Sequence, residues 1–556
     1  MTRTRRKAAG TLLAASALVL MTATVGLGSQ ASARTTTALN LAADEPPLVP
    51  VPRAECGSGS VPEPGMQGRV PADDVAAGGA ENGYLCNVEV VGREEGPGGF
   101  KVERYVDSSG RECAYYDTTR VFPADVVATL QGGNTPGVAV LDMSDSANPV
   151  RTATLSTPAM LTPHESLLVN QERGLIAAVA GNAAFQVGQV DVYDASADCR
   201  TPVLRSTLPV GILGHESGFS PDGNTFWAAS LGASTLTAVD LTDPARPRTV
   251  YVGNHDTHAV TISDDGTRAY LAAGAGFPRN EVGLPSDVDG LVVLDVSQVQ
   301  SRQPVPQVPV VGSTTWSSVT IPQAALPVTI GGKPYLVEMD EFAYNGNRIA
   351  GNGERVGAAR IIDISDETAP KVVSNIRLEV NQPENRAEIA GDPDATSATG
   401  GYAGHYCAVP QRAEPGIVAC TFLASGLRVF DIRDPLAPKE IAYFVRPVPP
   451  GGPANSAFSS PSFSPERNEI WYSDGGTGFY ALRLTNGVWP QAAAPAAGPG
   501  AATPPAAAPP TAAAPAARSA PARRLPATGL ALPIGAAAVL LGNALAIRRF
   551  GRRTPA

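Results

Sequence analysis

The sequence predicts an all-β fold built from a repeated unit, and two observations support this prediction. First, one pattern recurs along the middle of the chain: an apolar run ends in Asp and is followed by a polar turn, commonly with Pro. Second, the runs are rich in Val, Ile, Leu and Tyr, which favour strands, and they lack the apolar spacing of an amphipathic helix. The aspartates of the pattern lie 46 to 68 residues apart and are Asp142, Asp194, Asp240, Asp295, Asp363 and Asp431.

Each repeat is long enough for about four short strands, because another apolar run precedes each Asp-terminated run. Four strands per repeat of this length are typical of the blade of a β-propeller. We therefore expect a seven-bladed propeller of four-stranded antiparallel blades over residues 84–489. The Asp of each unit is expected to accept hydrogen bonds from backbone N–H groups in the following turn. The inner strands are predicted to begin near residues 84, 164, 215, 255, 316, 405 and 459.

The repeated unit resembles the LVIVD repeat, a propeller-type repeat of bacterial and archaeal surface proteins. It reads "ARIIDISDETAPKVV" at 359 and "GLRVFDIRDPLAPKEI" at 426, and the resemblance covers about 137–445. The last repeat lacks an outer strand, because "FYALRLTNGVW" runs directly into an Ala/Pro-rich tract. Residues 34–83 form an N-terminal segment, and its part from about 35 to 55 is predicted to supply the missing strand and close the ring.

Six cysteines suggest disulfides, because the N-terminal residues discussed in the next paragraph predict export from the cell. An internal match suggests how they pair: "GYLCNV" at 83 matches "GHYCAV" at 404, and "ECAYY" at 112 matches "ACTFL" at 419. Because the matched cysteines would lie on neighbouring strands, the predicted pairs are Cys86–Cys113 and Cys407–Cys420. The two cysteines that remain give the third predicted pair, Cys56–Cys199.

The first 33 residues are predicted to be a secretory signal peptide. Four basic residues precede an apolar run over 12–27, and Ala31-Ser32-Ala33 supplies the small residues that a signal peptidase reads. The segment is short and carries a cleavage site, which favours a signal peptide over a membrane anchor.

The other end of the chain resembles the cell-wall sorting signal of Gram-positive surface proteins. A pentapeptide is followed by an apolar run over 530–547 and by the basic tail "RRFGRR". The resemblance implies that sortase joins Thr528 to peptidoglycan and that Gly529 is the first residue lost. The Ala/Pro-rich residues 490–524 would then span the wall as an extended linker. The signal occupies 525–556, and its pentapeptide is Leu525, Pro526, Ala527, Thr528 and Gly529.

Charge argues against nucleic-acid partners. The formal net charge is −10, and loss of the eight basic residues in 1–33 and 529–556 would bring it to −18. An acidic protein of this kind has no general attraction for a phosphate backbone. We expect a monomer that is anchored to the wall and displayed outside the cell.

Four of the five histidines occupy one equivalent position of the repeat, the start of the inner strand. In a propeller all inner strands begin around one mouth of the central channel, so these side chains are expected to converge. Neutral imidazoles are common ligands of Zn and Cu, and adjacent carboxylates orient them. The candidate metal ligands are His164, His215, His255, His258 and His405, and the candidate supporting carboxylates are Glu165, Glu216 and Asp256.

Two interpretations of these histidines stay open. In WD-type propellers a histidine before the inner strand forms hydrogen bonds within its blade, so a repeated histidine is also a repeated structural device. The equivalent positions Trp316 and Tyr84 show that other residues are accepted there. Likewise, the long segments 338–357 and 381–404 suit either a rim over one face or a surface excursion.

These features give two main functional hypotheses, beside a third, a structural wall protein without a specific ligand. The first is a non-enzymatic, wall-anchored propeller whose head binds an extracellular protein, glycan or small molecule. The second is an extracellular metal-dependent oxidoreductase or hydrolase with Cu or Zn at the propeller mouth. No nucleophile motif, P-loop or dinucleotide fingerprint occurs in the chain. Fold alone does not decide between them, because propellers serve many functions.

Overall fold

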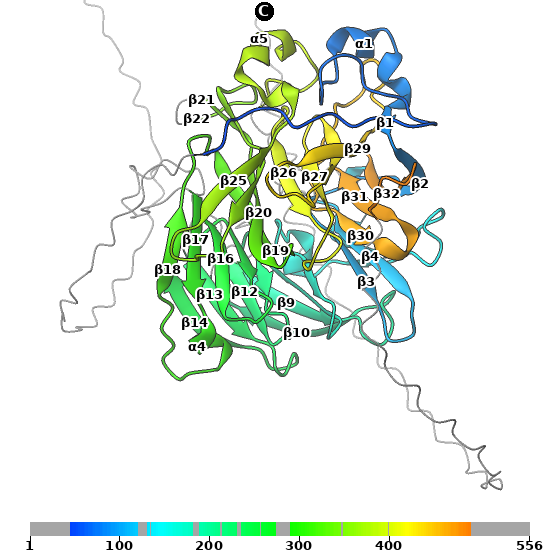
Figure 1. Cartoon of the computed structure of the whole chain (residues 1–556). Coiled ribbons are helices and arrows are strands. Elements are labelled where there is room, and N and C mark those ends of the chain that lie inside the picture. The colour runs from blue at the N-terminus through cyan, green and yellow to red at the C-terminus, as the bar shows by residue number, and fades with distance from the viewer. Residues whose placement is uncertain are drawn as a thin grey trace, which may run out of the picture. The chain divides into compact units, whose positions relative to one another are not determined.

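Seven antiparallel blades of four strands each, one of them extended by a fifth strand, are arranged around one axis in the computed structural model, as the sequence predicts (Figure 1). The structure describes residues 45–490, apart from 120–129, 134, 182–187, 212–213, 231–234, 256, 274–289, 346–347 and 398–399. The predicted signal peptide, most of the linker and the sorting signal lie outside the described residues. Within the described part no helix is long and apolar enough to cross a membrane.

The first four blades each follow the chain without interruption, with the inner strand first. Each strand pairs with the next in antiparallel register. They are β3 (Val102–Val106), β4 (Glu112–Asp117), β5 (Val138–Asp142) and β6 (Val150–Leu155); β7 (Leu168–Asn170), β8 (Leu175–Val179), β9 (Gln189–Asp194) and β10 (Val203–Pro209); β11 (Gly218–Phe219), β12 (Thr225–Ala229), β13 (Thr235–Asp240) and β14 (Arg248–Asn254); and β15 (Ala259–Ile262), β16 (Arg268–Ala273), β17 (Gly290–Asp295) and β18 (Val310–Thr314).

The last three blades carry the additions. A small sheet interrupts the fifth blade, and N-terminal strands join the sixth and seventh. Their strands are β19 (Ile321–Ile330), β20 (Lys333–Glu341), β24 (Ala359–Asp363) and β25 (Lys371–Ile376); β26 (Gly404–Ala408), β27 (Ile417–Phe422), β28 (Gly426–Asp431) and β29 (Lys439–Val445) with β1 (Tyr84–Cys86); and β30 (Ser462–Ser464), β31 (Glu469–Asp474) and β32 (Gly478–Leu484) with β2 (Val88–Glu94). The small sheet is β21 (Ala343–Asn345), β22 (Arg348–Ile349) and β23 (Arg355–Val356).

Helices are short and lie in connections. Two occur in the N-terminal segment, three in the connection between the fifth and sixth blades, and three elsewhere in the described part of the chain. They are α1 (Ala72–Ala76), η1 (Gly79–Asn82), α3 (Pro158–Leu161), α4 (Ser297–Gln300), η3 (Glu379–Asn381), η4 (Pro383–Asn385), α5 (Arg386–Ile389) and η5 (Pro465–Arg467).

The Asp-terminated pattern forms as predicted in all six repeats. Each Asp ends the third strand of its blade and accepts a hydrogen bond from the backbone N–H two residues later, at 2.8 to 3.0 Å. The Asp thus fixes the turn that leads to the outermost strand. The pattern therefore recurs because the first six blades share the same turn.

Ring closure differs from the prediction. The outer strand of the seventh blade is β2, which pairs with β32 in antiparallel register, and not the segment around 35–55. Tyr84–Cys86 begins no blade, because it adds a fifth strand to the sixth blade by pairing with β29. The first blade begins at Val102. The match between "GYLCNV" and "GHYCAV" indicated a strand, but local similarity does not specify which sheet edge a strand joins.

Two of the three predicted disulfides are wrong for the same reason. Cys407–Cys420 forms between neighbouring strands as predicted. The predicted pairs Cys86–Cys113 and Cys56–Cys199 do not form. Cys86 bonds Cys56 instead, and Cys113 bonds Cys199 across the first two blades.

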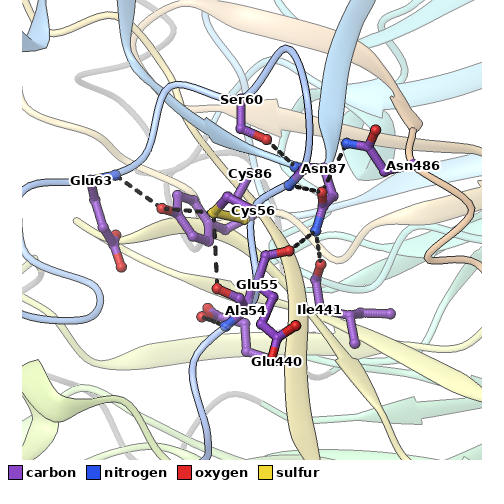
Figure 2. The surroundings of a disulfide bond; sticks show 12 residues. Ala54, Glu55, Cys56, Ser60, Glu63, Cys86, Asn87, Glu440, Ile441 and Asn486 are labelled. Atoms are coloured by element: carbon purple, nitrogen blue, oxygen red, sulfur yellow. Dashed lines mark hydrogen bonds between the residues drawn. A yellow bond between two sulfur atoms is a disulfide. The ribbon is translucent and has the colours of Figure 1, made fainter.

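Residues 45–83 form a segment that crosses the fifth and sixth blades, and we call it the N-terminal strap (Figure 1). Arg69 of the strap forms an ion pair with Asp392 at 2.8 Å. Arg53 binds Glu379, so the strap holds the connection between the fifth and sixth blades. Figure 2 shows its covalent attachment, the Cys56–Cys86 disulfide, surrounded by hydrogen bonds of Asn87 to strap and blade.

Candidate functional site: an axial histidine–carboxylate cluster

The starts of four inner strands bring histidines to the propeller axis. His164 and His215 lie a few residues before β7 and β11, and His258 directly precedes β15. His405 is the second residue of β26. Glu341, the last residue of β20, reaches the same place from a second strand. Because inner strands of a propeller surround the axis, side chains far apart in sequence meet here.

Two carboxylates link the imidazoles. Glu165 lies 2.9 Å from His215 Nδ1 through Oε2 and 3.6 Å from His405 Nε2 through Oε1. Glu341 lies 3.2 Å from His405 Nε2 through Oε2 and 3.3 Å from His258 Nε2 through Oε1. His405 therefore lies between both carboxylates. The side chains of these five residues are at most 6% exposed.

The rings are in direct contact. The centroids of His164 and His215 are 4.7 Å apart, and those of His215 and His258 are 4.0 Å apart. Ligand atoms of His164, Glu165 and His215 all lie within 4.8 Å of one another, and those of Glu165, Glu341 and His405 do as well. Glu165 belongs to both groups, so an ion bound at this carboxylate would be reached by imidazole nitrogens from several blades.

Several polar atoms of the cluster lack hydrogen bonds within the described part of the chain. His258 Nδ1 and Gln323 Oε1 are buried without a hydrogen-bond partner, and His405 Nε2 makes no hydrogen bond of normal geometry although it lies 3.2 Å from Glu341. Buried polar atoms are normally paired, and each exception asks for an explanation. A metal ion that accepts imidazole lone pairs would supply the missing partner.

The pKa values of the residues in the cluster are shifted in different directions. Burial and the neighbouring His215 hold the pKa of His258 well below its usual range. Burial also lowers the pKa of His215, but Glu165 outweighs it and the pKa is raised. Although burial alone would raise it, the pKa of Glu165 is lowered by His215 and His405. The pKa of Glu341 is raised by burial. The neutral imidazole is the form that binds metal, but His258 belongs to neither group of converging ligand atoms in the described residues.

The backbone at the cluster is unusual. His164 has φ of 41° and Glu165 has φ of 75°, so two consecutive non-glycine residues lie in the left-handed region. Such conformations cost of order 1–3 kcal/mol each and concentrate at functional sites. Gly181 permits this arrangement, since a Cβ there would lie 2.2 Å from the Cβ of His164.

A second polar layer lies on the side of the cluster toward the strand interiors. Lys101 Nζ binds Glu216 at 2.6 Å, and the Tyr406 hydroxyl donates to the other Glu216 oxygen at 2.7 Å. Gln323 donates to the Glu165 carboxylate of the cluster at 2.8 Å. Glu216 therefore neutralises Lys101 rather than orienting a histidine.

The other predicted residues lie elsewhere. His255 Nε2 is 2.7 Å from the Tyr251 hydroxyl, and His255 joins neither group of converging ligand atoms in the described part of the chain. Asp256 lies outside the described residues. Trp316 binds Asp340 within the fifth blade through its indole N–H. Tyr84, on the added strand, donates to Asp74 in the strap.

Sequence reasoning missed Glu341 and Lys101. Glu341 ends the run "YLVEMDE", in which acidic residues sit within an otherwise buried strand, and that was the available signal. Lys101 directly precedes the first residue of β3. With the first blade placed at Tyr84, this position was not recognised as the start of an inner strand.

Comparisons with known proteins add little beyond the fold. No protein-family model matches the chain, and no curated protein matches its sequence. A solved protein from Lactobacillus plantarum is 13% identical, covers 63% of this chain and 85% of its own, and has a TM-score of 0.40. The periplasmic gluconolactonase PpgL of Pseudomonas aeruginosa is also 13% identical, with 63% and 92% covered and a TM-score of 0.39.

Hydrazine synthase of Kuenenia stuttgartiensis is 15% identical, with 70% of this chain and 97% of that chain covered and a TM-score of 0.42. These likenesses are remote, and each TM-score lies below 0.5. What the protein does therefore has to be argued from its own site.

Proposed function

We propose that the protein is an exported, wall-anchored propeller whose head binds a transition-metal ion, Zn or Cu, at its axis. The observation that supports this most directly is the convergence of imidazole and carboxylate ligand atoms within 4.8 Å of one another in a buried site. Imidazole and carboxylate together suit Zn and Cu. The sequence features at the two ends support export and attachment through Thr528.

The donor set fits a metal better than it fits an internal salt bridge. A purely structural histidine would be fixed by hydrogen bonds within its own blade. Here Glu165 and Glu341 contact histidines from other blades, and His258 Nδ1 stays without a hydrogen-bond partner in the described residues. The left-handed backbone at His164 and Glu165 is a further cost that metal binding would offset. That the head mediates adhesion stays a prediction.

Elemental analysis tests the proposal. The protein is purified without a polyhistidine tag or chelating resin, incubated with Zn²⁺ or Cu²⁺ and dialysed. We expect near-stoichiometric metal, and we expect the double variant His215→Ala, His405→Ala to lose it. The matched control is His255→Ala, which removes an imidazole outside the cluster and should keep the metal. A metal-free wild-type protein after this treatment contradicts the proposal and makes the histidines structural.

A further inference from the structure

Beneath the histidine–carboxylate cluster the propeller axis contains a cavity of about 310 Å³, which we call the axial channel. Its lining comes from six inner strands, and on four of them the lining residues follow the cluster histidines in sequence, so the channel lies on the strand-interior side of the ligand residues. Phe219, Val260 and Leu326 contribute apolar wall. A volume of this size falls in the range of small-molecule sites.

At one end of the axial channel, the charged groups of the lining bind one another. Lys101 Nζ is 2.6 Å from Glu216 and lies 4.3 Å from the centroid of the Tyr406 ring. The Tyr406 hydroxyl occupies the second Glu216 oxygen. This ammonium group is therefore neutralised by one carboxylate and one aromatic face. It offers a ligand little net charge.

The other cation of the lining is also paired. Arg412 Nη1 lies 2.7 Å from Asp264 Oδ1 and donates to the carbonyl of Ile262 at 2.8 Å. Arg412 is therefore held by a carboxylate and a carbonyl, in a pair that is partly open to solvent because the Asp264 side chain is 70% exposed. Both positive groups of the channel thus have carboxylate partners.

Glu103 is the carboxylate that lacks such a partner. It lines the axial channel two residues after Lys101 on β3, and no ion pair joins it to a described residue. Burial raises its pKa to about 7, while Lys101 and a backbone hydrogen bond from Val169 oppose that rise. A carboxylate in apolar surroundings gains most from a cation that brings its own charge into the cavity.

We propose that the axial channel binds a small organic cation, with the ammonium group against Glu103 and the hydrocarbon part against Phe219, Val260 and Leu326. This site is separate from the metal centre and does not depend on it. The Lys101–Glu216–Tyr406 layer lies at the end of the channel nearest the cluster. Anionic ligands of the same size are disfavoured, because they would meet Glu103 with no unpaired cation nearby in the described residues.

Calorimetric titration with three probes of equal size tests the proposal: butylammonium, butanol and butyrate. The whole protein is used with a chelator present, so that the result is independent of bound metal. We expect butylammonium to bind at least tenfold more tightly than butanol and butyrate not to bind. Glu103→Gln should weaken butylammonium binding at least tenfold, and the exposed control Glu95→Gln should leave it unchanged.

A second variant separates loss of the site from loss of the fold. Leu326→Trp fills the channel without altering Glu103 and should abolish binding of all three probes. A thermal unfolding curve of each variant shows whether the propeller is intact. Equal binding of butylammonium and butyrate would overturn the proposal, and so would unchanged butylammonium binding in a folded Glu103→Gln or Leu326→Trp protein.

Discussion

Two buried ionic clusters of this protein contrast sharply. In the first, Arg428 joins the N-terminal strap to the sixth blade: it binds Glu440 at 3.0 Å and Glu63 at 2.5 Å. Gln67 donates to Glu440 at 2.9 Å, and the Arg428 guanidinium lies 4.4 Å from the Tyr443 ring centroid. We call this the strap cluster. The second is the axial histidine–carboxylate cluster, where several nitrogens have no hydrogen-bond partner in the described residues.

The difference separates a structural use of buried charge from a functional one. The charged groups of the strap cluster already bind one another, so none is available to a ligand. Removing one of them should therefore lower the stability of the protein. The axial cluster holds ligand atoms within reach of one another without pairing them all, so its removal should act on binding. Removing one partner of a complete buried ion pair is destabilising, because it leaves an uncompensated buried charge. Four predictions test this contrast.

The largest effect is expected for Arg428→Met in the strap cluster. The substitution leaves Glu63 and Glu440 buried without their cation, and breaking a buried pair in this way costs about 3–5 kcal/mol. Denaturant unfolding of wild-type and variant protein measures the change. Arg246→Met is the matched control, because the Arg246 side chain is 86% exposed and its surface pair should contribute under about 1 kcal/mol. Equal effects of the two substitutions would contradict the assignment.

Removing the Cys56–Cys86 disulfide should have the next largest effect. Its cysteines are 30 residues apart in sequence, against 13 for Cys407–Cys420. The chain-entropy account assigns about 3.6 kcal/mol to the longer loop and about 2.9 kcal/mol to the shorter. The Cys→Ser double variants are compared by thermal unfolding. If the strap pair has the smaller effect, the Arg428 contacts alone suffice to hold the strap.

Asp240→Asn removes the charge of a carboxylate that accepts several hydrogen bonds. We expect the free energy of unfolding to fall by about 1–2 kcal/mol. Asp240 accepts from the Thr242 amide and from Arg302, both at 3.0 Å. Burial would raise the pKa of Asp240, but these hydrogen bonds and Arg302 hold it below its ordinary value. The stabilisation is therefore complete above the unfolded-state pKa, about 4, and fades as the pH falls toward the folded-state value. Unfolding experiments between pH 7 and pH 2 follow this; a constant difference would contradict it.

The smallest effect on stability is expected for Glu341→Gln in the axial cluster. In metal-free protein burial raises the pKa of Glu341, and Glu165 also lies beside His405, so replacing this carboxyl by an amide should change the free energy of unfolding by under about 1 kcal/mol. Metal retention, measured by elemental analysis, should nevertheless fall. A loss of several kcal/mol in the metal-free protein would show that this cluster is structural like the strap cluster.

The sequence predicted those features that depend on local pattern. The Asp turns recur because the first six blades share the same backbone hydrogen bond, so the sequence carries six recognisable copies. Cys407 and Cys420 could be paired because one short turn separates their strands. The histidines could be placed at the start of inner strands, since their distance to the following turn is nearly constant from repeat to repeat.

What only the tertiary structure decided depends on how separate blades and segments meet. The chain before Val102 is not part of any repeat. Its path determines ring closure by β2, the partner of Cys86 and the position of Lys101. Glu341 reaches the axis from the second strand of its blade, a position that the histidine pattern does not cover. His255, three residues from His258, binds Tyr251 instead of joining the cluster. Local patterns specify strands and turns because those interactions are short in sequence, whereas a site assembled from several blades is fixed only once the ring closes.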